Sequence, residues 1–230
     1  MIARDAPIGF ETDRLLSPHS ITRGTVGITS AGVGVFGLLR YDPSRRRVEF
    51  APISGSTFAS TEYQLIVRET ILAWDGAPLG TPLVISFETS DQAYVQPPPP
   101  DSPRLSVDVV PLLARRCATA GCHASTDAVL NLDLSSAAAI RRTAIHVLAS
   151  ELAASGDVAT RSDPQWGELA RVDPGITPGF GLPGYSYLVY KIIGDGPIVG
   201  DRMPPPPLAP LTNDEISLVS DWIARGAPDD

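Results

Sequence analysis

The sequence has no long apolar runs and contains little lysine, cysteine, histidine or methionine. No stretch reaches the roughly 18 to 20 consecutive apolar residues of a membrane-spanning helix. The first residues, MIARDAPIGF, lack both the basic start and the apolar run of a signal peptide. Lys191 is the only lysine, and acidic residues outnumber basic ones by 26 to 18, which gives a net charge of -8. Such a surface repels nucleic acid and anionic membranes, and it favours a basic protein partner.

Cysteine, histidine and methionine are equally scarce, yet several of them lie close together. Cys117 and Cys122 are the only cysteines, and His123 follows directly in the segment RRCATAGCHAS. The remaining histidines are His19 and His146. A hydrophobic fraction of 43% in 230 residues suffices for a buried core in one large or two small domains. The clustered ligand-type residues therefore need a chemical explanation more than a packing one.

A proline-rich segment divides the chain. QPPPPDSP, residues 96–103, can neither pair in a sheet nor continue a helix, and four consecutive prolines favour a stiff polyproline conformation. The residue patterns differ on its two sides. The sequence therefore predicts one domain over residues 1–95, a linker over 96–103 and a second domain over 104–230.

Residues 1–95 show alternating apolar positions, which indicate short strands separated by turn-prone clusters. The alternating sets are Val26 and Ile28, Val48 and Phe50, Tyr63, Leu65 and Val67, and Leu83, Ile85 and Phe87. Short alternating strands at this spacing predict an antiparallel β-sandwich. His19 lies in a predicted turn, and we interpret it as an ordinary surface residue.

Residues 104–230 carry helical signals. We expect a helix that Ser106 caps and that runs to about Arg116, a second over 137–152 capped by Ser135 or Ser136, and a short third over 185–193. The last helix has the clearest signals, because Thr212 and Glu215 form a capping box and Gly226 stands at a C-terminal glycine position. Its apolar stripe is Ile216, Val219, Trp222 and Ile223.

The cysteine cluster is a variant of the C-x-x-C-H signal for covalent haem attachment. In that chemistry two thiols add to the vinyl groups of the porphyrin, and the adjacent histidine supplies the proximal nitrogen to the iron. Four residues separate Cys117 from Cys122 here instead of two, and residues 118–121 are all small enough to loop out. We therefore predict that Cys117, Cys122 and His123 bind haem.

Three other interpretations stay open for this cluster. A tight loop could hold a Cys117–Cys122 disulfide, although this would leave His123 unexplained. A zinc site would need His19 and His146 to complete four ligands, and neighbouring residues such as Cys122 and His123 rarely reach one tetrahedral ion together. The cluster could also be coincidental, with two free thiols beside a histidine.

An electron-transferring haem needs a sixth iron ligand, and Met203 is the candidate. Apart from Met1 it is the only methionine, and it lies in the proline-rich loop GDRMPPPPLAP ahead of the last helix. It belongs to no helical or strand stripe, unlike a methionine that fills a core. His146, in an alanine-rich segment, is the alternative sixth ligand. The predicted metal ligands are thus His123 and Met203.

Two resemblances extend these predictions. SPHSITRGTVGI, RRRVEFAP, STEYQLIV and WDGAPLGTPLVISFET, within about residues 5–90, resemble a bacterial Ig-like domain of the exported, SbsA-like kind. VVPLLARRCATAGCHAS, LNLDLSS, RVDPGITPGFGLPGYSYLVYKIIG, RMPPPP and LTNDEISLVSDWIARGAP, within about residues 104–228, resemble a cytochrome c domain of large bacterial secreted proteins. The second resemblance implies an all-α cytochrome c fold with one covalent haem c, anchored by Cys117 and Cys122 and ligated by His123 and Met203.

The expected function is that of an exported monohaem c-type cytochrome domain, which carries single electrons on an Ig-like spacer to a redox partner and is not an enzyme. Two alternatives are a haem enzyme with an open iron position, of peroxidase-like or gas-binding kind, and a non-redox adhesion module with a disulfide-closed loop.

We also expect an incomplete first domain. Domains of the Ig-like kind open with a strand and a turn ahead of the segment matching RDAPIGFETDRLLSP, whereas only four residues precede Asp5 here. We therefore expect that Met1 is an artificial or mis-assigned start and that the natural chain begins upstream with a signal sequence and one more strand. The expected location is the periplasm or the cell surface.

Overall fold

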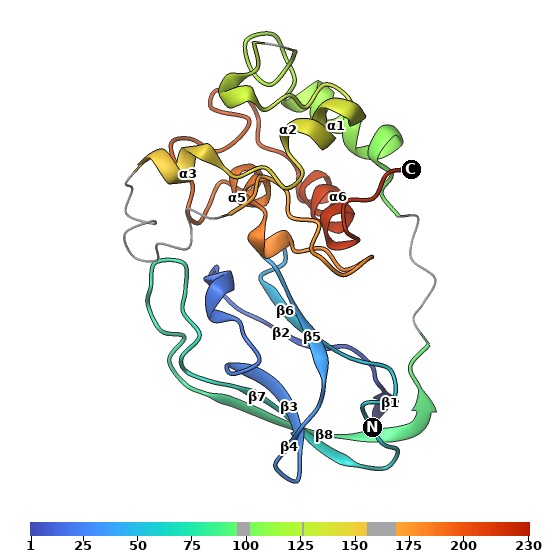
Figure 1. The fold of residues 1–230 in the computed structure, drawn as a ribbon. Coiled ribbons are helices and arrows are strands. Elements are labelled where there is room, and N and C mark those ends of the chain that lie inside the picture. Colours follow the sequence, from blue (N-terminus) through green and yellow to red (C-terminus); the bar gives the residue numbers. More distant parts are fainter. Residues whose placement is uncertain (96–101, 126, 156–168) are drawn as a thin grey trace. The chain divides into compact units, whose positions relative to one another are not determined.

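A computed structural model describes residues 1–95, 102–125, 127–155 and 169–230 of the chain. The chain divides into two compact units, one of Met1–Tyr41 and Arg46–Pro100 and the other of Asp42–Arg45 and Asp101–Asp230. We call them the strand unit and the helix unit after their main elements (Figure 1). Most of the predicted linker, residues 96–101, lies outside the described residues.

The strand unit contains two sheets. The larger has the strand order β1-β8-β7-β3-β4 and the smaller the order β2-β6-β5. Their strands are β1 (Ile2–Arg4), β2 (Ile8–Glu11), β3 (Val26–Ser30), β4 (Val33–Gly34), β5 (Gly37–Asp42), β6 (Arg47–Pro52), β7 (Glu62–Val67) and β8 (Leu83–Ala93). A short 3-10 turn, η1 (Pro18–Ser20), holds His19. The strand pairs β2–β6, β3–β4, β3–β7 and β7–β8 are antiparallel, but β1 runs parallel to β8.

Three of the four alternating sets point into one core. Side chains from β3, β5, β6 and β7 share a single buried cluster, which includes Val26, Ile28, Tyr41, Val48, Phe50, Tyr63, Leu65 and Val67. The predicted strand at Leu83, Ile85 and Phe87 is present as β8, but its apolar side is covered only in part. Phe87 packs on the core, but Leu83 is 41% exposed and Ile85 is 40% exposed. Alternation in the sequence identifies the strand, whereas the neighbouring elements decide whether its apolar side is covered.

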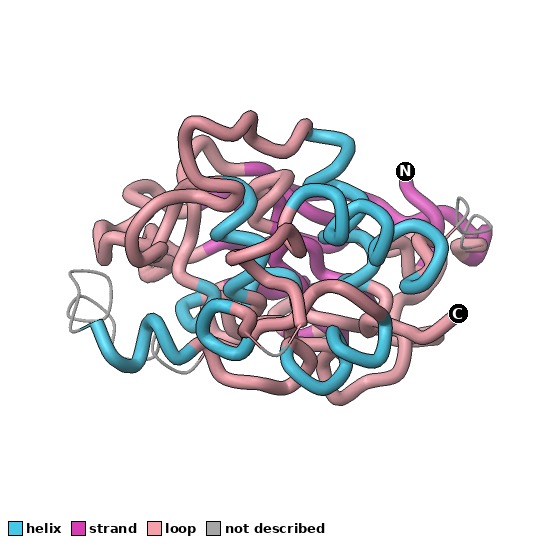
Figure 2. Tube along the Cα trace, turned by 90° about the horizontal axis from the view of Figure 1, so that it is seen from above, coloured by secondary structure: helices cyan, strands magenta, loops and turns pink. Residues whose placement is uncertain are grey.

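The helix unit contains short helices joined by long loops (Figure 2). A π-helical turn η2 (Leu105–Val109) leads into α1 (Val110–Arg116), and the other helices are α2 (Ala137–Thr143), α3 (Ser150–Ser155), α5 (Tyr187–Ile193) and α6 (Asn213–Ala224). Single 3-10 turns lie at η3 (Val129–Asn131) and η5 (Pro183–Tyr185). None of the helices in the described residues is both long and apolar enough to cross a membrane.

The predicted fold class, an Ig-like sandwich followed by an all-α cytochrome c fold, is wrong. Only 24% of the structure is helical, and α6, the longest described helix of the helix unit, has 12 residues. Glycine and proline explain the short helices, since they recur throughout RVDPGITPGFGLPG and GDGPIVGDRMPPPPLAP and interrupt helical hydrogen bonding. Extended backbone takes their place in part, with isolated β-bridges between Ile145 and Val172 and between Leu148 and Ala170.

These bridges also correct the predicted helix over 137–152. Ser136 caps its start as expected, since its side chain accepts a hydrogen bond from the Ala139 amide. The helix then ends at Thr143, and His146 adopts a left-handed conformation with a φ of 57°. The amide of His146 donates to the Val172 carbonyl at 3.0 Å. A long-range strand-like contact thus replaces helical propensity in this segment.

The first and last helices of this unit, α1 and α6, meet in one core. Leu112 and Leu113 of α1 share a buried cluster with Trp222 and Ile223 of α6. The capping box at Thr212 and Glu215 is present, and Gly226 follows the helix with a φ of 87°. The prediction of Ser106 as a helix cap is wrong, because the cap position of η2 is Arg104 and Ser106 lies inside the turn. This core supports the end of α1, where the cysteine cluster begins.

Candidate functional site

The cysteine cluster forms a closed loop at the end of α1. Cys117 is the capping residue directly after that helix, and its amide donates to the Leu113 carbonyl at 2.7 Å. The chain then turns through Gly121, whose φ of 77° suits glycine because it has no Cβ. The His123 amide donates back to the Cys117 carbonyl at 3.2 Å. The four residues between the cysteines, two more than in the common spacing, are therefore absorbed in a loop that brings its two ends together.

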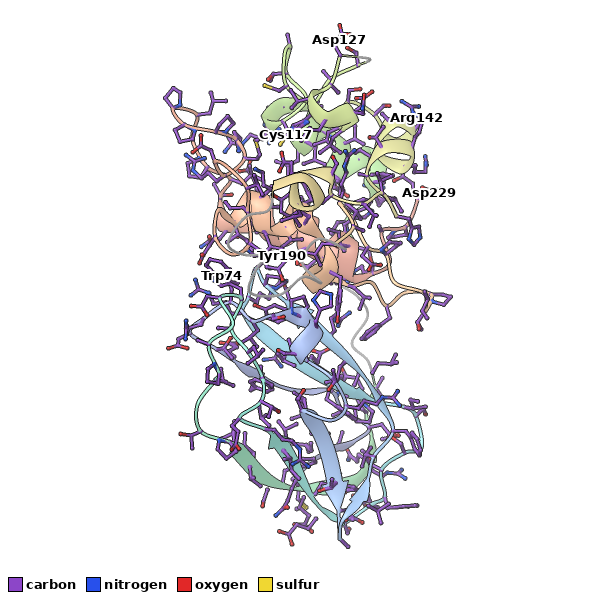
Figure 3. The ribbon with its side chains drawn as sticks, turned by 60° about the vertical axis from the view of Figure 1, so that its left-hand side comes forward. Trp74, Cys117, Asp127, Arg142, Tyr190 and Asp229 are labelled. Carbon is purple, nitrogen blue, oxygen red and sulfur yellow. The ribbon has the colours of Figure 1, made fainter. Side chains whose placement is uncertain are left out.

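Both cysteines are free thiols, but their surroundings differ. Cys117 is buried in the core of the helix unit, at the end of the α1 ribbon in Figure 3, whereas Cys122 is partly exposed. Burial raises the pKa of the Cys117 thiol to about 11, although the nearby Arg116 guanidinium opposes the shift. Cys117 therefore stays protonated at neutral pH, and the environment does not activate it as a thiolate nucleophile.

His123 is held in one ring orientation. Its side chain is 9% exposed, and Nδ1 lies 3.1 Å from the Leu132 carbonyl oxygen. A carbonyl only accepts, so Nδ1 must carry the proton and donate. In the neutral ring Nε2 then keeps its lone pair, and within the described residues it has no hydrogen-bond partner. Burial lowers the pKa of His123, which favours that neutral form. This arrangement is the one that metal-bound histidines use.

The segment after the loop fixes His123 from the other side. The Leu134 amide donates to the His123 carbonyl, and the Val129 amide donates to the Cys122 carbonyl, both at 2.8 Å. The Arg171 guanidinium donates to the backbone carbonyls of Leu130 and Asn131 in this segment, and to that of Thr143 at the end of α2. Arg171 therefore joins the segment to α2. Arg171 is buried, and no carboxylate lies within ion-pair distance of it among the described residues.

Met203 approaches the loop from a different part of the chain. Its amide donates to the Lys191 carbonyl in the last turn of α5 at 2.8 Å. The Arg202 guanidinium donates to the carbonyls of Pro204 and Leu208, which braces the proline-rich turn that follows. Met203 is thus half-buried on a supported loop 80 residues after His123 in the sequence.

Two adjoining cavities bring these side chains together. Cys117, His123 and Met203 line both of them. The inner one has a cavity volume of about 50 Å³, and its other lining residues are Leu130, Leu132, Leu134, Ala149, Ser150, Glu151, Arg171, Tyr187, Leu188 and Lys191. The outer one has a cavity volume of about 230 Å³ and also includes Cys122, Val129 and Pro204. All four predicted haem-binding residues therefore face one apolar space.

The other histidines lie elsewhere. His146 is exposed and lines neither cavity, so nothing places it as a second axial ligand. His19 belongs to η1 of the strand unit. In the part of the chain that the structure describes, no group of three or more histidine, cysteine or acidic residues could hold a metal ion. The zinc interpretation therefore has no support from the described residues.

Three charged residues of the inner cavity were not among the predicted site residues: Glu151, Arg171 and Lys191. The sequence did contain one sign that Lys191 is buried, because the only lysine of the chain lies in the apolar segment YLVYKII. Glu151 and Arg171 had none, because isolated charged residues in a sequence are usually on the surface.

The chain matches no protein-family model, and no curated protein is significantly similar to it.

Proposed function

We propose that this cavity binds one haem covalently through Cys117 and Cys122 and that the protein carries single electrons. The observation that supports the proposal most directly is the convergence of both thiols, the His123 ring and the Met203 thioether on one apolar space. These side chains come from two chain segments that the fold brings together. Leu130, Leu132, Leu134 and Leu188 also line the inner cavity and supply the apolar contacts that a macrocycle requires.

The state of the thiols suits attachment. Each thiol would add across one vinyl group, so that its sulfur bonds to one vinyl carbon and its hydrogen moves to the other. This addition needs reduced thiols that are not in a disulfide, and no external oxidant. Cys117 and Cys122 are both free, and Cys117 is protonated at neutral pH.

His123 and Met203 would hold the iron. The hydrogen bond to the Leu132 carbonyl leaves Nε2 of His123 available and restrains the ring. A histidine–methionine pair tends to raise the reduction potential of a haem iron. When bound, the haem supplies an iron that cycles between two oxidation states. The protein would hold both ligands, and the buried cation Arg171 lines the cavity, where it could pair with a propionate.

We further propose that the protein works in the periplasm or at the cell surface, because covalent haem attachment in bacteria takes place outside the cytoplasm. The net charge of -8 favours a basic redox partner protein.

The test is the mass and spectrum of the full chain produced with export and a haem-attachment system. We expect a mass increase of one haem that survives acid and organic extraction, and a low-spin spectrum with a methionine–iron charge-transfer band. Cys117→Ala and Cys122→Ala should each leave one thioether or none, while the control variant Ser54→Ala, at an exposed position of the strand unit, keeps both. Extractable haem would contradict covalent attachment. High-spin iron would favour an open-site enzyme, and a haem-free Cys117–Cys122 disulfide would favour a scaffold module.

A further inference from the structure

The single lysine of the chain occupies an unusual position. Lys191 is 6% exposed, and it lies on α5 within the wall of the inner cavity. Burial of an ammonium group costs several kcal/mol unless all of its donors are satisfied. A buried lysine in a chain whose other basic side chains are arginines therefore needs a specific reason.

This ammonium has two hydrogen-bond acceptors and one ion-pair partner. Nζ donates to the Val199 carbonyl at 2.8 Å and to the Asp201 carbonyl at 2.9 Å, and it lies 3.5 Å from a Glu151 carboxylate oxygen. Two of these partners belong to the short segment that leads to Met203. Lys191 therefore reaches across from α5 and holds that segment by its backbone.

The backbone of the same residue holds Met203 directly. The Lys191 carbonyl belongs to the last turn of α5, where helical carbonyls lack partners within the helix. It accepts the Met203 amide at 2.8 Å. The chain between them turns at Gly194, whose φ is 79°, and a Cβ there would contact Arg202. One residue thus fixes Met203 both through its carbonyl and through its side chain.

Tyr187, one helical turn earlier, reinforces the arrangement. Its hydroxyl donates to Glu151 Oε2 at 2.9 Å and accepts the Val199 amide at 3.0 Å. Glu151, Tyr187 and Lys191 therefore form one polar cluster, and Val199 is bound at both its amide and its carbonyl. This cluster connects α3, α5 and the segment before Met203.

We propose that Lys191 is a positioning residue that holds Met203 against the cavity and so sets the sixth ligand of the haem iron. The inference about the iron ligand rests on the proposed function, whereas the bracing of the Met203 segment does not. Lys191→Met keeps the apolar length of the side chain and removes all three donors. Lys191→Arg keeps the charge and several donors, and it should restore much of the wild-type behaviour.

The first measurement uses the haem-loaded chain and the rate of carbon monoxide binding to the reduced iron, which rises with the fraction of molecules that have released methionine. In Lys191→Met we expect that fraction to rise about tenfold, ~1.4 kcal/mol, with a weaker charge-transfer band in the oxidised protein. Met203→Ala gives the limit of complete loss. Arg115→Met, which removes an exposed cation paired with Glu215, is the matched control and should behave as wild type.

Two further experiments separate the possible failures. The double variant Lys191→Met/Glu151→Gln removes the charge imbalance, and it should still release methionine if bracing is the cause. Amide hydrogen exchange of the haem-free chain should be faster at Met203 in Lys191→Met and unchanged at Cys117. A wild-type chain without covalent haem would refute the proposed function, and the exchange rates would then decide the bracing alone. Unchanged methionine ligation and unchanged exchange at Met203 in Lys191→Met would overturn the inference.

Discussion

The end of α1 carries Cys117, so we expect the stability of the site to depend on the core residue Leu113. Leu113 is 0% exposed and shares the core of the helix unit with Trp222 and Ile223. Its carbonyl also accepts the amides of Cys117 and Ala118, at 2.7 and 2.9 Å. The substitution Leu113→Ala tests whether this core holds the cysteine loop in place.

The expected cost follows from the burial. Leu113→Ala removes three buried carbon atoms, and at about 0.8 kcal/mol each the lost transfer energy is about 2.4 kcal/mol. The cavity that remains adds roughly 24 cal/mol per Å³, which brings the loss in free energy of unfolding to about 3–4 kcal/mol. Val107→Ala in the adjacent η2 is the matched control. Val107 is 49% exposed, so we expect a loss below about 1 kcal/mol.

The assay is urea unfolding of the haem-free chain, followed by tryptophan emission in a Trp74→Phe background. Trp74 is the only tryptophan before the proline-rich segment, so the remaining emission follows the later residues. A lower midpoint at constant slope measures the stability change. Equal effects of Leu113→Ala and Val107→Ala, or a loss below about 1 kcal/mol for Leu113→Ala, would refute the assignment of this core.

Three other predictions concern the haem-free chain. Burial lowers the pKa of His123, so this residue's contribution to the free energy of unfolding is complete above the unfolded-state pKa of about 6.5 and is lost as the pH falls through the lower folded-state pKa. Urea midpoints between pH 7 and 4 should show this loss, and His123→Gln should reduce it. Iodoacetamide at pH 8 should alkylate Cys122 faster than Cys117, whose pKa is raised to about 11, and equal rates in the native state, as in urea, would contradict the burial of Cys117. Gly181→Ala should prevent stable folding of the helix unit, because a Cβ there would overlap the Ile223 carbonyl oxygen; a circular dichroism melt like that of wild type would contradict this packing.

Local patterns in the sequence predicted several elements correctly. The capping box and apolar stripe placed α6, and the alternating residues placed β3, β6 and β7, because helix caps and strand alternation depend on neighbours a few residues apart. The same patterns failed where distant contacts compete. The segment after Thr143 leaves the helix to pair with residues near Val172, and the apolar side of β8 stays exposed at Leu83 and Ile85.

For the site, the sequence by itself singled out Cys117, Cys122, His123 and Met203, because their chemistry is rare in this chain and their spacing is close to that of a known attachment signal. Only the tertiary structure brings Met203 to the same cavity as His123, since the two are far apart in the chain and a hydrogen bond to α5 positions the later one. The fold alone also decides that Arg171 and Lys191 are buried. Their charges are tolerated because backbone carbonyls from other segments converge on them, an arrangement that no local sequence pattern encodes.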